Sequence, residues 1–171
     1  MTRDEINSIF QQYGPVVYRR ALQILGNEAD AKEALQEVFI RAIRGGQQFE
    51  GRSQISTWLY RITTNFCLNR IRDSKRRREL LEERGLPVEL DGAQPTNPTT
   101  DKIILVRKLL AKADPEQAKA AVCVYIDGMS HSEAAEILDV SRRTVGNLLD
   151  RFNTWAQGFI QQGEVDTLDR R

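Results

Sequence analysis

The sequence predicts an all-α protein of two small helical domains joined by a flexible linker. Apolar residues recur at steps of three and four along most of the chain, which is the period of an amphipathic helix. Residues 85–100 contain two glycines, three prolines and no helical period, as is typical of a linker. We therefore expect an N-terminal domain of three to four helices over residues 1–84, a C-terminal domain over residues 101–157 and a tail over residues 158–171.

The first domain should begin with two helices of moderate length. The first should start near Asp4, be kinked or interrupted at Pro15, and end at Gly26. The second should cover residues 28–44. The apolar residues expected to face the core from this second helix are Ala31, Ala34, Leu35, Val38, Phe39, Ala42 and Ile43.

The outer face of this second helix carries a short acidic strip formed by Asp30, Glu33, Gln36 and Glu37. Acidic residues near a helix N-terminus are favoured by the helix dipole, so a solvated face is enough to explain them. A docking surface for a basic partner is the functional alternative. The residues by themselves favour the solvated face.

One long helix is expected over residues 52–78, with two different faces. Ile55, Leu59, Ile62 and Phe66 recur at steps of four, three and four, which predicts a face toward the core. The other face carries Trp58, Arg61, Asn65, Asn69, Arg72 and Arg76. Amides can read base edges, guanidinium groups can hold phosphates, and an indole ring can stack on an unpaired base.

The charge of the chain is concentrated around this helix. The whole chain has a net charge of +1, but residues 52–78 hold eight basic residues against one acid, and residues 79–101 hold one against six. Such a basic block indicates a nucleic-acid surface, although a solvated helix with a basic C-terminal end is the alternative. Phe49, in the polar loop before the helix, should be an anchor or close over a flipped-out base.

The second domain should be made of short helices. A helix over residues 101–113 is followed by Asp114, a good N-cap, and by Pro115, which suits a first helical position. That next helix should stop at Gly128. Ser130 and Glu133 then form a capping-box pattern before a helix that ends near Leu138.

A tight turn at Asp139-Val140 and a helix to about Trp155 complete a helix-turn-helix pattern. Ala135 is small, as the close crossing of two helices requires. In such a motif the N-terminal part of the second helix meets base edges and phosphates in the major groove. The residues at that place are Ser141, Arg142, Arg143, Thr144 and Asn147. A simple helical hairpin is the alternative, but it does not explain two arginines beside the cap.

Several functional classes find no support in the sequence. No apolar run approaches the roughly 20 residues of a membrane helix, and the N-terminus lacks the apolar region of a secretory signal, so we expect a cytoplasmic protein with no membrane insertion. Cys67 and Cys123 should be reduced and half-buried. With one histidine, no phosphate loop and no metal spacing, we expect no enzyme activity, no metal and no cofactor.

Taken together, the two halves resemble a bacterial family, the extracytoplasmic-function sigma factors. Residues 30–43, DAKEALQEVFIRAI, resemble the family's stretch that docks on the β′ clamp helices of RNA polymerase. Residues 49–77 resemble its promoter-melting and minus-ten-reading helix, and residues 114–152 resemble its minus-thirty-five-reading domain. The motifs are in order, and the resemblance covers residues 4–157.

The resemblance implies a sigma factor that binds core RNA polymerase and directs promoter-specific initiation. It implies polymerase contacts at Asp30, Glu33, Gln36, Glu37 and Phe39. It implies minus-ten contacts and melting at Phe49, Arg52, Trp58, Arg61, Asn65, Asn69, Arg70, Arg72, Lys75, Arg76 and Arg77. The implied partners are the β′ clamp helices, the β flap and promoter DNA, with an anti-sigma protein as a further candidate. The implied minus-thirty-five contacts are Ser141, Arg142, Arg143, Thr144 and Asn147.

Two departures from the family pattern affect the second domain. Asp139 stands where the family usually has glycine, and an aspartate tolerates a left-handed backbone better than most residues. Gly146 weakens the recognition helix by about 1 kcal/mol relative to alanine, and Asp150 opposes phosphate. Upstream-element binding should therefore be weaker or differently directed. The competing readings are an operator-binding regulator that never touches polymerase, and an adaptor or antagonist that kept only the fold.

Overall fold

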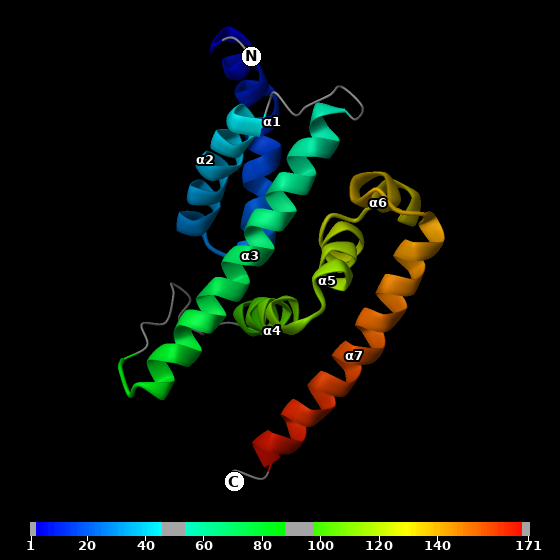
Figure 1. Ribbon diagram of the computed structural model, residues 1–171. Helices are drawn as coiled ribbons and strands as arrows, with labels where there is room; N and C mark the ends of the chain where they lie inside the picture. The colour runs from blue at the N-terminus through cyan, green and yellow to red at the C-terminus, as the bar shows by residue number, and fades with distance from the viewer. Residues whose placement is uncertain (1–2, 46–53, 88–97, 169–171) are drawn as a thin grey trace. The chain divides into compact units, whose positions relative to one another are not determined.

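The computed structural model describes residues 3–45, 54–87 and 98–168, with side chains for residues 5–45, 54–87 and 103–162. Every element among these residues is helical, which confirms the all-α prediction (Figure 1). In chain order the elements are α1 (Arg3–Leu25), α2 (Glu28–Gly45), α3 (Ile55–Glu83), α4 (Pro98–Lys112), α5 (Pro115–Ala121), the π-helix η1 (Val122–Ile126), α6 (His131–Leu138) and α7 (Arg142–Leu168).

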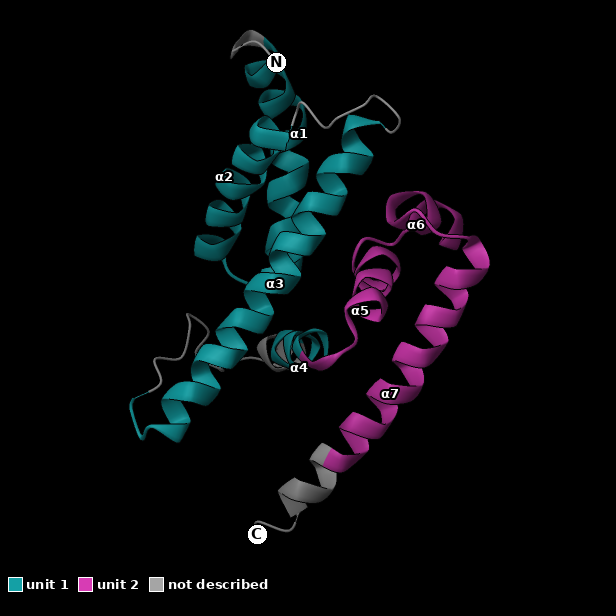
Figure 2. Cartoon of the chain, viewed as in Figure 1, with its two compact units in different colours: residues 1–111 teal, residues 112–171 magenta. Residues whose placement is uncertain are grey.

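The chain divides into two compact units, residues 1–111 and 112–171 (Figure 2). By this division α4 belongs to the first unit, although the sequence had suggested that its residues open the second domain. One close contact joins α4 to the rest of unit 1. A Cβ on Gly26, which has φ +76°, would stand 2.7 Å from Cγ2 of Ile103 in α4. The turn between α1 and α2 therefore needs glycine both for its backbone and for its contact with α4.

In unit 1, α1, α2 and α3 pack against one another around an apolar core. α1 is continuous from Arg3 to Leu25, so of the two predicted outcomes at Pro15, a kink or an interruption, the interruption is wrong. Pro15 and Gln11 are both exposed, so the proline lies on the solvent side of α1, where a carbonyl without an amide partner can be hydrated. The large residues buried in this core are Val17, Ile24, Leu25, Val38, Phe39, Leu59, Phe66, Leu68 and Ile71.

The buried face of α3 differs from the predicted one. Leu59 and Phe66 are buried as expected, but Ile55 and Ile62 are only half-buried. Thr63 and Thr64 take their place, because each hydroxyl donates to the carbonyl four residues earlier, at 2.7 and 2.8 Å, and so enters the core with its hydrogen bond made. Cys67 and, in unit 2, Cys123 form no disulfide, and both are fully buried rather than half-buried.

Unit 2 contains α5, η1, α6 and α7, and its predicted caps are confirmed. Oδ1 of Asp114 accepts hydrogen bonds from the amides of Glu116 and Gln117. Ser130 and Glu133 form both hydrogen bonds of a capping box. Asp139 has φ +58°, the left-handed conformation that the turn requires. The helix-turn-helix is therefore present, with Val145 and Leu149 of α7 and Ala134, Ala135 and Ile137 of α6 buried at its centre.

α7 is longer than the sequence predicted, because it continues beyond Trp155 to Leu168. Three aromatic rings follow its inner side. The rings of Phe152 and Trp155 have centroids 6.0 Å apart, and those of Trp155 and Phe159 are stacked at 5.5 Å. Lys112 lies over the ring of Phe159 at 4.9 Å. These contacts hold a helical extension where the sequence had suggested a tail.

Candidate nucleic-acid interface

The basic face of α3 is displayed along the solvent side of unit 1. Asn65, Asn69, Arg76 and Arg77 are exposed. Arg61, Arg72 and Lys75 are half-buried, and Lys75 pairs with Glu79 at 3.3 Å. A continuous run of amides and cations on one helix can follow a nucleic-acid backbone. Phe49 and Arg52, also predicted for this interface, lie outside the described residues.

Arg70 is placed differently from the other arginines of α3. Its Nη2 lies 2.7 Å from Oε2 of Glu33 and 3.1 Å from Oδ1 of Asp30, and its Nη1 donates to Oε1 of Glu33 at 3.1 Å. The guanidinium therefore joins α3 to the N-terminal part of α2. In this arrangement Arg70 makes structural ion pairs, whereas the sequence had suggested a free phosphate contact. The pairing spans 37 to 40 residues, and nothing in the local sequence marks it.

Asp30 is a tightly held member of this cluster. Its backbone amide donates to Oδ1 of Asn27 at 2.8 Å, and the Asn27 side chain donates to Oδ2 of Asp30 at 2.6 Å. Burial alone would raise the pKa of the Asp30 carboxyl. The hydrogen bonds from Asn27 and Arg70, together with the charges of Arg70 and Arg107, outweigh burial and lower that pKa. Asp30 is thus an ionised residue in the first turn of α2, and both of its carboxylate oxygens accept hydrogen bonds.

The outer face of α2 continues the acidic strip with apolar residues. Glu33 and Gln36 are exposed, and Glu37 lies 3.9 Å from Arg41. Further along the helix, Ile40 and Ile43 are 38% and 43% exposed, so the prediction that Ile43 faces the core is wrong. An acidic start followed by exposed isoleucines is a mixed surface of the kind that protein partners cover.

Phe39, which the sequence placed in the polymerase contact, is buried beneath this face. It is 6% exposed and packs edge-on against Phe10, with ring centroids 4.8 Å apart. Its ring packs α2 against α1. Ile40, its neighbour in sequence, is the apolar side chain that faces outward; its exposure could have been inferred from its helical phase with Gln36 and Glu37.

Trp58 lines an apolar groove at the end of unit 1 where α2 stops and α3 begins. The groove has a volume of about 420 Å³ and is bounded by the first turns of α1, the last turns of α2 and the start of α3. The indole is half-buried, and a Cβ on Gly45 would lie 3.4 Å from its Cζ2. Trp58 is therefore turned partly toward α2, while Asn65 and Asn69 face solvent.

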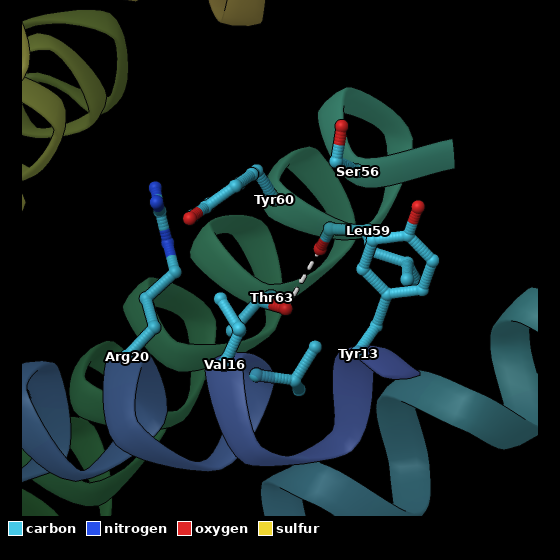
Figure 3. Close-up of a pocket in the computed structure, with 8 residues that line it drawn as sticks. Tyr13, Val16, Arg20, Ser56, Leu59, Tyr60 and Thr63 are labelled. Carbon is cyan, nitrogen blue, oxygen red and sulfur yellow. Dashed lines mark hydrogen bonds between the residues drawn. The ribbon is translucent and has the colours of Figure 1, made fainter. Parts of the chain in front are cut away.

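A second hollow, between α1 and α3, is much smaller (Figure 3). Its volume is about 10 Å³, which is at most the room that a single water molecule occupies. Arg20 lies beside it, with its guanidinium 4.3 Å from the centroid of the Tyr60 ring and Nη2 donating to Oγ1 of Thr64 at 2.6 Å. This buried arginine, which the sequence gave no reason to single out, joins α1 to α3.

In unit 2 the start of α7 presents all five predicted residues to solvent. The Ser141 hydroxyl accepts from the Thr144 amide at 3.0 Å and lies 2.8 Å from the Thr144 hydroxyl, so both hydroxyls take part in the helix cap. Arg142, Arg143 and Asn147 make no side-chain hydrogen bond or ion pair to the rest of the described chain. They are the groups left available to a ligand.

Comparison with known proteins agrees with both units. The Sigma-70 region 2 family matches residues 9–77, and a Homeodomain-like domain family matches residues 114–161. The ECF RNA polymerase sigma factor SigW of Bacillus subtilis is 30% identical over 159 residues, which cover 87% of this chain and 85% of that protein. This chain belongs to the ECF RNA polymerase sigma factors. Sigma factors are regulatory subunits.

One further sequence relative and one solved structure are similar to this chain. The ECF RNA polymerase sigma factor SigE of Mycolicibacterium smegmatis is 29% identical over 168 residues; the match covers 94% of this sigma factor and 63% of the relative's length. The sigma factor RpoE of Bartonella quintana, solved in complex with the anti-sigma factor NepR, has the same fold, with a TM-score of 0.55 at 20% identity over 92% of this chain and 97% of that one.

Neither a metal-holding cluster nor a membrane-spanning helix is present among the described residues. Within the described ranges, no three His, Cys, Asp or Glu side chains are grouped so as to hold a metal ion. Across the same part of the chain, no helix is both long enough and apolar enough to cross a bilayer.

Proposed function

We propose that this sigma factor binds core RNA polymerase and directs it to specific promoters, without catalysing a reaction itself. The observation that carries the proposal is the pairing of two unlike faces in unit 1. An acidic and apolar face of α2 lies beside a basic and amide-bearing face of α3, and Arg70 joins the two helices. A separate unit then supplies an exposed helix-turn-helix. Since transcription takes place in the cytoplasm, we place the protein there.

The polymerase contact in this proposal is the outer face of α2. Glu33, Gln36 and Glu37 would meet a basic part of the β′ clamp helices, and Ile40 would be covered by the partner's apolar side chains. Acidic residues around an apolar centre match the usual anatomy of a protein interface. The β flap is the proposed partner of unit 2. An anti-sigma protein is a further candidate, because the related RpoE structure contains one.

The minus-ten contact in this proposal is the basic face of α3 with the groove at Trp58. Asn65, Asn69, Arg72, Arg76 and Arg77 would follow the non-template strand as the duplex opens. One flipped-out base would enter the groove, where an indole face and apolar walls favour stacking. Phe49 and Arg52, which precede α3 in sequence, belong to the same proposed contact.

The exposed start of α7 would bind the minus-thirty-five element.

Run-off transcription tests the proposal as a whole. Core RNA polymerase is given genomic promoter fragments with and without the full chain, and discrete transcripts should start only when the chain is present. If the chain binds the fragments and starts no transcript, it is a DNA-binding regulator and the proposal is wrong.

Glu37→Lys tests the polymerase contact separately. Glu37 is half-buried on the outer face of α2, so reversing its charge should lower the amount of sigma–core complex in co-purification while the circular dichroism melting curve stays unchanged. Glu82→Lys is the matched control, because Glu82 is an exposed acid at the far end of α3. Equal assembly by the two variants would remove α2 from the interface.

A further inference from the structure

The solvent side of α7 carries four residues at the spacing by which a helix reads DNA, of which three are exposed and Gly146 is half-buried. Arg143, Gly146, Asn147 and Asp150 stand at i, i+3, i+4 and i+7, a spacing at which side chains of a recognition helix reach successive base pairs. Their span of seven residues is about 10 Å at roughly 1.5 Å per residue, or about three base-pair steps. These residues therefore form one reading face.

Gly146 is not required by the protein's own packing. A Cβ added to it would meet no atom within 4 Å, and its backbone is ordinary α-helix. Glycine weakens a helix interior relative to alanine, so the fold alone would favour a larger residue here. Gly158 in α7 is equally open. What distinguishes Gly146 is its place between the side chains that face DNA, where a missing side chain lets the backbone approach closely.

The two side chains next to Gly146 on this face are both short. Asn147 and Asp150 are exposed, and neither side chain is bonded to another group in the described part of the chain. An Asn side chain pairs with N6 and N7 of adenine, and an Asp carboxylate accepts from N4 of cytosine. Side chains of this length reach base edges only when the helix axis lies deep in the major groove. A long side chain at position 146 would keep the helix axis from entering the groove this deeply.

We propose that Gly146 seats α7 deep in the major groove, where Asn147 selects an adenine and Asp150 selects a cytosine within about three base pairs. The proposal rests on the proposed function, and it names the upstream sequence that this sigma factor prefers. It also gives Asp150 a role. A carboxylate near the groove wall is repelled by phosphate, whereas on the groove floor it is satisfied only by a base-pair donor, so wrong sequences are penalised.

The test is transcription by the full chain with core RNA polymerase from a promoter library whose upstream element is randomised. Active templates should be enriched for an adenine and a cytosine within about three base pairs. With Asp150→Asn the cytosine preference should fall about 5- to 10-fold while the adenine preference remains. Gly146→Lys should bind DNA as well or better, because it adds a cation, but both preferences should flatten.

Arg151→Gln is the control for charge. Arg151 is exposed about a quarter turn from the reading face, so its loss should reduce transcription from all templates by a similar factor. Melting curves check that each variant folds. The inference is overturned if Asp150→Asn changes activity on every template alike, or if Gly146→Lys keeps both preferences. Absence of transcripts from every template would instead reject the proposed function.

Discussion

At the scale of single residues, the position of Arg70 decides how the two faces of unit 1 relate. Its guanidinium is bound in a bidentate arrangement by Glu33 and also by Asp30, so two acids of the predicted polymerase surface are held by an arginine of the predicted DNA surface. The pairs are only partly shielded from water, and their contribution is therefore moderate. Their main effect is to fix the angle at which the two faces are presented.

Arg70→Ala should destabilise unit 1 by about 1–2 kcal/mol, because it removes charge-assisted hydrogen bonds and leaves a partly buried carboxylate without its partner. Urea unfolding of the full chain measures the loss. Arg76→Ala is the matched control: Arg76 is an exposed α3 arginine with no ion pair to any described residue, and its variant should change stability by less than about 0.5 kcal/mol. Equal stability of the two variants would contradict a stabilising role for the Arg70 ion pairs.

Asp30 should make the stability of unit 1 depend on acid. Because the folded pKa of Asp30 lies below its ordinary value, its ionised form stabilises the fold fully at pH values above about 4. That contribution is lost as pH falls through the lowered pKa. The difference in unfolding free energy between the protein and Asp30→Asn should therefore be present at pH 7 and shrink below about pH 4. A difference that stays constant across this range would exclude the linkage.

At the scale of elements, the sequence specified the capped ends of the unit 2 helices well, but not the C-terminal ends of α3 and α7. The caps at Asp114 and Ser130 and the turn at Asp139 each follow from one residue and its immediate neighbours. α3 and α7 both continue past their predicted ends, to Glu83 and Leu168. In α7 the added turns contain Phe159, which stacks on Trp155 of the same helix and lies under the cation of Lys112 from α4.

Two truncations test which part of the α7 extension stabilises unit 2. A chain that ends at Gln162 keeps Phe159 and should melt like the full protein. A chain that ends at Thr154 loses the buried Ala156 and both outer rings, and unit 2 should be destabilised by about 2 kcal/mol or more. Hydrogen exchange of the α5 and α6 amides measures this within unit 2. Unchanged protection in the chain that ends at Thr154 would show that the extension stabilises nothing.

At the scale of the whole molecule, the net charge is +1, but the basic and acidic residues are concentrated in different segments of the chain. The basic residues are concentrated in α3, and the acids that follow lie at its end and in the next segment. Of the α3 cations, Arg70 and Lys75 are already paired with carboxylates of unit 1. Salt-dependent DNA affinity should therefore come from only a subset of the cations that the sequence counts.

This subset can be counted by the salt dependence of holoenzyme binding to minus-ten DNA. Arg76→Ala and Arg77→Ala should each reduce the slope of log affinity against log salt by about 1. Arg70→Ala should leave the slope nearly unchanged, because its charge is satisfied by Asp30 and Glu33. A slope that falls equally for all three variants would place Arg70 on phosphate in the complex and show that its ion pairs open on binding.

The sequence by itself determined the helical class, the order of the helices and the helix-turn-helix. These depend on interactions within one helix or one turn: the apolar period, the capping oxygen of Ser130, the left-handed tolerance of Asp139 and the exposed cations at the start of α7. A resemblance carried by local motifs was accordingly sufficient to indicate the family. The assignment of individual residues to DNA and polymerase contacts stays a prediction.

The tertiary structure alone decided which residues of each face are available. Arg70 bonds to acids some forty residues away, Phe39 turns inward onto Phe10, and Ile43 stays exposed although its helical phase is apolar. Ile103 of α4 meets Gly26 at the turn after α1, and α4 belongs to unit 1. The physical reason is the same in each case: helical period fixes the direction of a side chain around its own axis, but the neighbour it meets depends on how separate helices pack.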